Sequence, residues 1–269
     1  MSPAPEYVRA RTVLLDALEA LGAQREAVVL VGAQAIYLQV GDADLAVPVM
    51  TTDGDLALDP RRLIDLPLVH EAMAANGFIA LRQPGAWQGR YGVQIDLMVP
   101  EALAGRPGHR GADLGVHGRT TARQTRGLEA ALIDREHRRI SSLEEGDGRT
   151  FEMVVAGAAA LLVAKLVKIA ERIGTHRQED KDALDVLRLL RGTETAPLAA
   201  RLDMLRADPI AGAVTLDALT HLGPLFANPQ GIGCGMAARA AWPALSSEEI
   251  TASCVALASD LRLELDRRA

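Results

Sequence analysis

Short apolar runs alternate with stretches of helical spacing in the first half of the chain. Leucines at intervals of four and three predict an amphipathic helix over about residues 7–21. Residues 27–31 form an apolar, valine-rich run, which predicts a buried strand. Gly32 follows at once and residues 33–40 again have helical spacing, so we expect a strand, a tight glycine turn and a helix in that order.

Two further strands are predicted, and both contain acidic residues. The first runs through residues 51–58, with Asp-Gly-Asp in its middle, and ends before an Asp-Pro pair. The second runs through residues 91–99, ends at a proline and has Asp96 as its lone acid. Between them, residues 68–75 have the pattern of a helix closed by Asn-Gly, and residues 78–81 that of a short strand.

The second half of the chain changes to long helical periodicity. The predicted helices span four segments: 158–172, 178–190, 199–206 and 247–265. Prolines and glycines between residues 224 and 235 indicate an irregular connection. We therefore expect an α/β (α+β) fold, with a mixed sheet flanked by helices in a core domain of residues 1–148 and an all-helical C-terminal domain of residues 149–269.

The charge of the chain limits how it can bind nucleic acid. A formal net charge of -6 argues against a protein that coats nucleic acid through global attraction. Aromatic residues make up only 3% of the chain, which leaves little material for stacking single-stranded bases. Arginines are frequent, and acids few, in one region, which is either a surface that follows phosphates or an ordinary solvated face. These arginines are Arg106, Arg110, Arg119, Arg123, Arg126, Arg135, Arg138 and Arg139.

No segment of the sequence has the pattern of a membrane span or a secretory signal. A run of about 18 consecutive apolar residues is missing, and the first residues do not combine a basic segment with an apolar stretch and a cleavage site. We expect a cytoplasmic protein with no membrane partner. Cys234 and Cys254 lie in no metal-binding pattern, and we interpret both as ordinary buried thiols.

Three aspartates form the candidate site. Residues two apart in a strand point to the same face, so Asp53 and Asp55 can direct both carboxylates into one pocket. Two ionised carboxylates that converge normally require a cation, and Mg²⁺ is held by one or two carboxylates together with substrate phosphates. Asp96 is the natural third member if its strand pairs beside the first. The alternative is that Asp-Gly-Asp is simply a turn, because both residue types favour turns.

These residues resemble the nucleotidyltransferase superfamily. Its pattern is a strand, a small glycine turn that opens a helix, an Asp-x-Asp pair and a third carboxylate on a later strand. The matching positions are Val31-Gly32-Ala33, Asp53-Gly54-Asp55 and Asp96. The resemblance implies a nucleotidyltransferase-type mixed sheet, a nucleoside triphosphate (NTP) substrate and Mg²⁺ bound by Asp53, Asp55 and Asp96.

The chain looks more narrowly like the AbiEii/AbiGii nucleotidyltransferase toxins of type IV toxin-antitoxin systems, which include the MenT toxins. That family adds a lysine motif and a Lys-Asp-x-x-Asp motif in its helical half. The matching segments are Thr51-Thr52-Asp53-Gly54-Asp55, Lys165-Leu166-Val167-Lys168 and Lys181-Asp182-Ala183-Leu184-Asp185. The resemblance implies catalytic roles for Lys165, Lys181 and Asp182, beside the three aspartates. It also implies nucleotide contacts, for which the candidates are Gly32, Ala33, Thr51, Thr52, Lys168 and Arg172. The alternative for Lys181 and Asp182 is a surface cluster that caps the helix and forms salt bridges.

A cationic stripe is predicted in the helical half. Lys165, Lys168 and Arg172 recur at intervals of three and four, so on a helix they share one face, turned away from the apolar residues. Lysine binds phosphate as a point charge, so this stripe can neutralise a triphosphate. The alternative is a solvated face with a pair such as Lys168 and Glu171.

The resemblance leaves three functions to weigh. The first is transfer of a nucleoside monophosphate to the 3′ end of tRNA or a similar RNA, by a toxin with an antitoxin protein as partner. The second keeps the chemistry with a small-molecule acceptor. The third is a degenerate fold that binds nucleotide or a partner without turnover. This third function is motivated by Ala33, where the family usually has glycine or serine, and by Val49-Met50, where it often has arginine.

Overall fold

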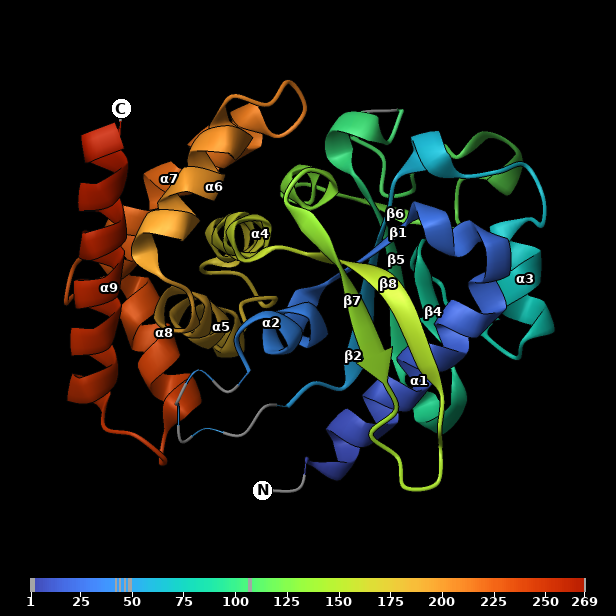
Figure 1. The fold of residues 1–269 in the computed structure, drawn as a ribbon, viewed down its shortest axis with the longest axis horizontal. Helices are drawn as coiled ribbons and strands as arrows, with labels where there is room; N and C mark the ends of the chain where they lie inside the picture. Colours follow the sequence, from blue (N-terminus) through green and yellow to red (C-terminus); the bar gives the residue numbers. More distant parts are fainter. Residues whose placement is uncertain are drawn as a thin grey trace. The chain divides into compact units, whose positions relative to one another are not determined.

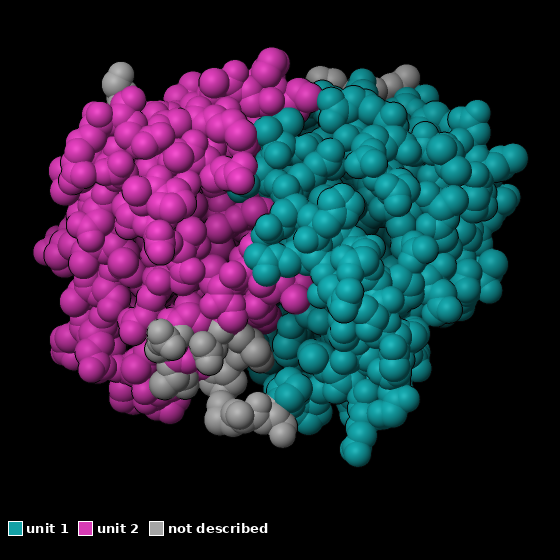
Figure 2. Space-filling model, in the orientation of Figure 1, with its two compact units in different colours: residues 1–35, 49–156 teal, residues 36–48, 157–269 magenta. Residues whose placement is uncertain are grey.

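A computed structural model describes residues 3–41, 43, 45, 47, 50–105 and 108–268 of the 269-residue chain. The chain divides into two compact units, coloured separately in Figure 2. Unit 1 consists of Met1–Ala35 and Val49–Ala156, and unit 2 consists of Ile36–Pro48 and Gly157–Ala269. Unit 1 contains a mixed sheet flanked by helices and unit 2 is helical, so the α/β fold class predicted from the sequence is confirmed.

A mixed sheet organises unit 1 (Figure 1). Among the described residues it has eight strands: β1 Val28–Val31, β2 Asp53–Leu58, β3 Ile79–Ala80, β4 Ala86–Gln88, β5 Gln94–Pro100, β6 Arg123–Thr125, β7 Arg135–Ser141 and β8 Thr150–Ala156. The order is β3-β4-β5-β2-β1-β8-β7, and β6 also pairs with β5. β5 is parallel to β2 and to β6, β1 is parallel to β8, and the other pairs are antiparallel.

One face of this sheet is covered by helices α1 (Pro5–Leu21) and α3 (Val69–Ala75), which lie on the same side in Figure 1. α1 contacts β2, β5 and α3. Gly54 points toward α1, because a Cβ at this position would meet the side chains of Ile95 and Leu14. Side chains alternate along a strand, so the residues on either side of Gly54 point to the opposite face.

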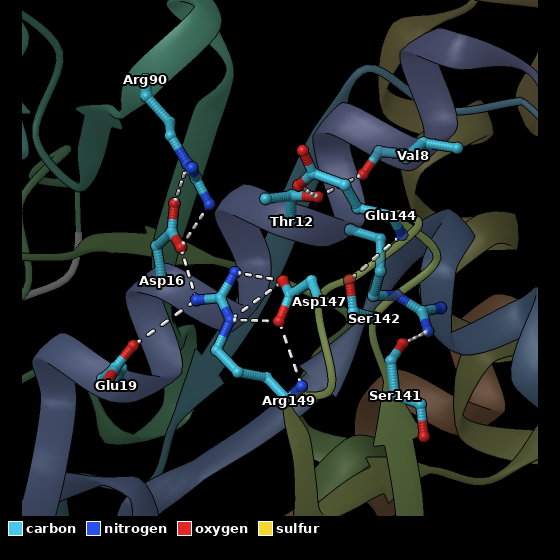
Figure 3. Close-up of polar contacts among 11 residues, drawn as sticks. Val8, Thr12, Asp16, Glu19, Arg90, Ser141, Ser142, Glu144, Asp147 and Arg149 are labelled. Atoms are coloured by element: carbon cyan, nitrogen blue, oxygen red, sulfur yellow. Dashed lines mark hydrogen bonds and ion pairs between the residues drawn. The ribbon is translucent and has the colours of Figure 1, made fainter.

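The β7–β8 hairpin is fastened to α1 by polar contacts (Figure 3). Arg149 Nη1 lies 2.7 Å from Asp16 Oδ1, and Thr12 Oγ1 donates to Glu144 Oε2 at 3.1 Å. Arg149 also donates through its main chain and side chain to Asp147, and these bonds hold the pKa of the Asp147 carboxyl below its usual value. The hairpin is therefore anchored on the helix that covers one face of the sheet.

Unit 2 is built from the helices that follow β8 and from part of α2. Its helices are the C-terminal part of α2 (Gly32–Val40), α4 Ala158–Arg172, α5 Asp180–Gly192, α6 Thr195–Arg206, α7 Gly212–Phe226, α8 Ile232–Ala241 and α9 Ser247–Arg268. α4 packs on α5 and α7, α5 packs on α8, and α9 packs on α6 and α8. Their buried faces consist mainly of leucine, alanine and valine.

Short 3-10 turns complete the secondary structure: η1 Gly22–Ala27, η2 Pro60–Arg62, η3 Arg90–Gly92, η4 Glu101–Leu103, η5 Gly115–His117 and η6 Glu129–Leu132. Searched over the described part of the chain, the helices include none with both the length and the apolar character needed to cross a bilayer.

The elements differ from the sequence-based expectations at several places. Asp53 and Asp55 lie at the start of β2, not in its middle. The sheet continues through β8, because residues 150–156 pair with both β1 and β7, and unit 1 ends at Ala156 where the sequence had suggested residue 148. The segment expected to be an irregular connection contains the last turn of α7, including Pro224, and the start of α8.

Candidate functional site

Asp53 and Asp55 occupy the face of β2 that points away from α1. Both are half-buried. Asp55 lies opposite Val31 of β1 and, on the other side, in register with Asp96 of β5. Side chains of directly paired residues share a face of the sheet, so the structure places Asp96 beside Asp55 on the face that also carries Asp53.

Gly32 shapes the wall beside Asp55. It follows β1 directly and has φ of +68°, a left-handed conformation that other residues adopt only at a cost. A Cβ at this position would overlap the Oδ2 atom of Asp55. Gly32 therefore allows the carboxylate to lie against the turn that begins α2. Ala33, the next residue, is buried.

Asp53 is held through its side chain and its main chain. Thr51 Oγ1 donates to Asp53 Oδ1 at 2.7 Å. Gln34 Nε2, from the first turn of α2, donates to the main-chain oxygen of Asp53 at 3.0 Å. Asp53 Oδ2 has no hydrogen bond to any of the residues that the structure describes. Of the two threonines predicted to contact nucleotide, Thr51 is buried and Thr52 is exposed.

Asp96 is 7% exposed and has two partners on one oxygen. Its Oδ1 atom accepts from Gln94 Nε2 at 2.8 Å and lies 2.7 Å from Arg123 Nη1. Arg123 Nη2 also lies 3.1 Å from Met98 Sδ, two residues further along β5. Asp96 Oδ2 has no hydrogen bond or ion pair with any residue in the described ranges. One oxygen is thus fixed, whereas the other remains able to accept a proton or a hydrogen bond.

The donor chemistry of this face fits a magnesium ion. No group of three or more His, Cys, Asp or Glu side chains in residues 3–41, 43, 45, 47, 50–105 and 108–268 can by itself hold a metal ion in this structure. Magnesium is usually bound by one or two carboxylates, with phosphate oxygens and water as the remaining ligands. Asp53 and Asp55 supply that pair, whereas metal binding by Asp96 through Oδ1 requires Arg123 to release it.

In unit 2, the lysine motif forms a buried ionic cluster. Lys165 is 6% exposed, and its Nζ lies 2.6 Å from Asp182 Oδ1 and 2.7 Å from Asp185 Oδ2. Burial opposes the charged form of Lys165, but Asp185 and Asp182 outweigh it and raise its pKa. Burial likewise opposes ionisation of Asp182, but Lys165 and Lys168 lower its pKa to about 2. Lys165 and Asp182 therefore stay charged near neutral pH.

The rest of the predicted cationic stripe is paired as well. Lys168 Nζ lies 2.9 Å from Asp182 Oδ1, and Arg172 Nη1 lies 3.6 Å from Glu179 Oε1. Lys181 is exposed, 3.9 Å from Glu179 Oε2. The stripe was expected to point away from apolar residues, but α5 packs on α4 and covers Lys165. Helical spacing predicted that the three cations share one face of α4, but it could not show that α5 packs against that face.

The arginine-rich segment is only partly available as a docking surface. Arg123 is committed to Asp96. Three others pair with neighbouring acids: Arg119 with Asp113 at 3.2 Å, Arg138 with Glu136 at 2.8 Å and Arg139 with Glu152 at 3.0 Å. Arg106 lies outside the described residues. Much of the positive charge predicted for this region is therefore compensated locally.

Comparison with known proteins finds a likeness among solved structures. No protein-family model matches the chain, and no curated protein matches it. Among solved structures, it is similar to an antigenic nucleotidyltransferase-like protein from Paracoccidioides brasiliensis, with 17% sequence identity and a TM-score of 0.40. That alignment covers 80% of this chain and 94% of the other.

Two side chains near Asp53 had no signal in the sequence. Gln34 reaches the main chain of Asp53, and Arg11 of α1 donates through Nε to Gln34 Oε1 at 2.8 Å. Gln34 lies two residues after the glycine turn, a position that periodicity assigns to an ordinary helix. The link to Arg11 spans 23 residues, so only the folded chain brings the two together.

Proposed function

We propose that this protein is a magnesium-dependent nucleotidyltransferase, which moves a nucleoside monophosphate from an NTP to an acceptor hydroxyl and releases pyrophosphate. One observation carries the proposal: Asp53 and Asp55 share a face of β2, with Asp55 against the Gly32 turn and in register with Asp96. Carboxylates placed together in this way repel one another unless a cation joins them. The motifs of the sequence support the same chemistry.

The residues of this face divide the work. Asp53 and Asp55 would hold magnesium, which neutralises charge on the phosphates when it is bound. Asp96 Oδ2 accepts the proton of the acceptor hydroxyl while its Oδ1 remains fixed by Gln94 and Arg123. The acceptor oxygen forms a bond to the α-phosphorus, the bond from that phosphorus to the bridging oxygen breaks, and pyrophosphate leaves. Positioning supplies much of the rate, since the groups are already oriented.

The turn at Gly32 and Ala33 is the proposed phosphate cradle. Free N–H groups at the start of a helix attract phosphate oxygens, and α2 begins at this turn. Thr51 contributes indirectly because its hydroxyl orients Asp53. To bind phosphate, Lys168 must leave Asp182 and Glu179, and Arg172 must leave Glu179. Lys165 must leave two buried carboxylates. We therefore assign Lys165 and Asp182 to the stability of unit 2, and phosphate binding by Lys168 and Arg172 stays a prediction from the sequence.

For the acceptor, we propose the 3′ hydroxyl of an RNA such as tRNA, in keeping with the toxin motifs, with an antitoxin protein as the natural inhibitor. The test is incubation of the protein with each labelled NTP, Mg²⁺ and total RNA. Label in an RNA band supports this acceptor. Label in a small product with none in RNA would instead assign the transfer to a small-molecule acceptor.

The ion pair between Arg123 and Asp96 favours a second candidate, a protein that binds nucleotide without turnover. A guanidinium 2.7 Å from the carboxylate competes with any proton or cation for the same oxygen. Calorimetry separates the two functions. Binding of magnesium and NTP with no pyrophosphate release in the presence of RNA would support the second candidate, and pyrophosphate release supports the first.

A further inference from the structure

Arg11 has a buried guanidinium group, whose hydrogen-bond partners among the described residues are all uncharged. It is 3% exposed, on α1. Its Nε donates to Gln34 Oε1 at 2.8 Å, Nη1 to the main-chain oxygen of Ser141 at 3.2 Å and Nη2 to Tyr7 Oη at 2.9 Å. In the part of the chain that the structure describes, no carboxylate lies within ion-pair distance of it.

An arginine in this environment is costly to bury. Removal of a charge from water is unfavourable unless an opposite charge or full hydrogen bonding compensates. Burial accordingly lowers the pKa of Arg11 below the usual value for arginine. Apolar residues of similar volume fill such a position at no comparable cost. The guanidinium therefore requires an explanation beyond packing.

The chemistry of the two side chains fixes the orientation of Gln34. Arginine only donates hydrogen bonds, so the atom of Gln34 that faces it must be the amide oxygen. The amide nitrogen of Gln34 then faces the other way, where it donates to the main-chain oxygen of Asp53 at 3.0 Å. Gln34 is 1% exposed, so water cannot substitute readily in either contact. Without Arg11, the Gln34 amide can rotate so that its oxygen faces the main-chain oxygen of Asp53, and the hydrogen bond between them is lost.

We propose that Arg11 and Gln34 form a positioning pair that fixes the start of β2, and thereby the direction of the Asp53 carboxylate. This inference rests on the proposed function, because Asp53 is a proposed magnesium ligand. Gln34 holds the main chain of Asp53, and Thr51 holds its side chain. Ser141 and Tyr7 hold the guanidinium in turn. The pair acts through Asp53, to whose main-chain oxygen Gln34 donates.

Gln34→Glu separates this role from a structural one. The carboxylate keeps the size of the side chain and forms an ion pair with Arg11, so the fold is retained. Its second oxygen now faces the Asp53 carbonyl with no proton to donate, so the positioning contact is lost. We expect the melting temperature to stay at or above that of the parent, while kcat/KM falls about 10- to 100-fold, the range found when groups behind metal ligands are removed. The Mg²⁺ concentration for half-maximal rate rises, and amide exchange across residues 51–55 becomes faster.

Gln24→Glu is the matched control. Gln24 is also 1% exposed, and its amide nitrogen donates to the main-chain oxygens of Ile64 and Pro67, both at 2.7 Å. This substitution removes contacts of the same kind, but to residues that lie outside β2. We expect it to lower the melting temperature and to leave the Mg²⁺ dependence unchanged. Arg11→Lys is the second variant, which keeps the positive charge but lacks the planar guanidinium group. We expect a smaller fall in kcat/KM than for Gln34→Glu.

The outcomes distinguish the inference from the proposed function. If the parent transfers nucleotide and both Gln34→Glu and Arg11→Lys fold and transfer as it does, with unchanged Mg²⁺ dependence, the positioning role is overturned. If the parent transfers no nucleotide, the proposed function fails, and amide exchange alone decides the inference. Faster exchange over residues 51–55 in Gln34→Glu, but not in Gln24→Glu, supports the pair, and unchanged exchange overturns it.

Discussion

Carboxylates of the same type have opposite surroundings in the two units. On β2 and β5, Asp53 and Asp96 each have one oxygen fixed and the other without a partner among the described residues. Between α4 and α5, Asp182 and Asp185 are buried against Lys165, and Asp182 also contacts Lys168. The carboxylates of β2 and β5 can still bind a cation, whereas those of α5 are already paired with lysine side chains. A motif of charged residues therefore indicates a ligand site only where its charges are still incompletely paired.

Lys165→Met tests the ionic cluster between α4 and α5 and has the largest expected effect on stability. The substitution leaves the buried carboxylate of Asp185 without its cation and leaves Asp182 with Lys168 alone. Breaking a buried pair in this way typically costs about 3–5 kcal/mol. Urea unfolding of the parent and the variant measures it. A variant as stable as the parent would show that Lys165 does not stabilise unit 2.

Lys168→Met is the control for that experiment. Lys168 is partly exposed and shares Asp182 with Lys165, which still neutralises it after the substitution. We expect a loss of only about 0.5–1 kcal/mol, the range for pairs near the surface. If both variants lost the same free energy of unfolding, Lys165 would not be the main cation of this cluster.

Gly32→Ala tests the sheet side. The new Cβ must displace the Asp55 carboxylate and must also adopt a positive φ, so we expect a loss of about 1–3 kcal/mol together with a loss of nucleotide transfer. Gly77→Ala is the matched control, with φ of +83° and nothing within 4 Å of the added Cβ. It should be destabilised by backbone strain while it keeps its activity. Thermal melting and pyrophosphate release separate the two effects.

Acid should weaken unit 2 through Asp182. Its pKa is about 2 in the folded protein against 3.8 ordinarily, so the unfolded chain takes up the proton first as the pH falls. The stabilising contribution is complete above about pH 4 and is lost as the pH falls toward 2, for a total of roughly 2 kcal/mol. Urea unfolding between pH 5 and pH 2.5 should show a smaller pH dependence for Asp182→Asn than for the parent. Identical slopes would contradict the paired state of Asp182.

A small effect on stability is expected at the hairpin anchor. Arg149→Gln removes the contacts to Asp16 and Asp147, which are only partly exposed, and should cost about 1 kcal/mol with little change in transfer. Arg139→Gln breaks a fully solvated pair with Glu152 and should change stability by less. If the two arginines were equivalent in melting experiments, the anchor on α1 would have no special role.

Much of the local structure followed from the sequence, because it depends on nearby residues. The strand at 28–31, the glycine turn and the helix after it were predicted from apolar runs and one glycine. β8 was missed, since its neighbours β1 and β7 are needed to show that residues 150–156 belong to the sheet.

The site was predictable in part for the same reason. Alternation along a strand placed Asp53 and Asp55 on one face, and the register of β2 with β5 then added Asp96. The partners of the charges were not predictable. Arg123 on Asp96 and Asp185 on Lys165 depend on which elements pack together, and spacing along the chain has no information on that.

The central claim is that the Asp53 and Asp55 carboxylates hold magnesium for nucleotide transfer. The most direct test is the rate of pyrophosphate release as a function of Mg²⁺ concentration, with NTP and total RNA, for the parent and for Asp55→Asn, which keeps the shape of the side chain and removes its charge. We predict a Mg²⁺-dependent rate for the parent and a rate at least about 100-fold lower for the variant. Equal rates in the two proteins would contradict the account.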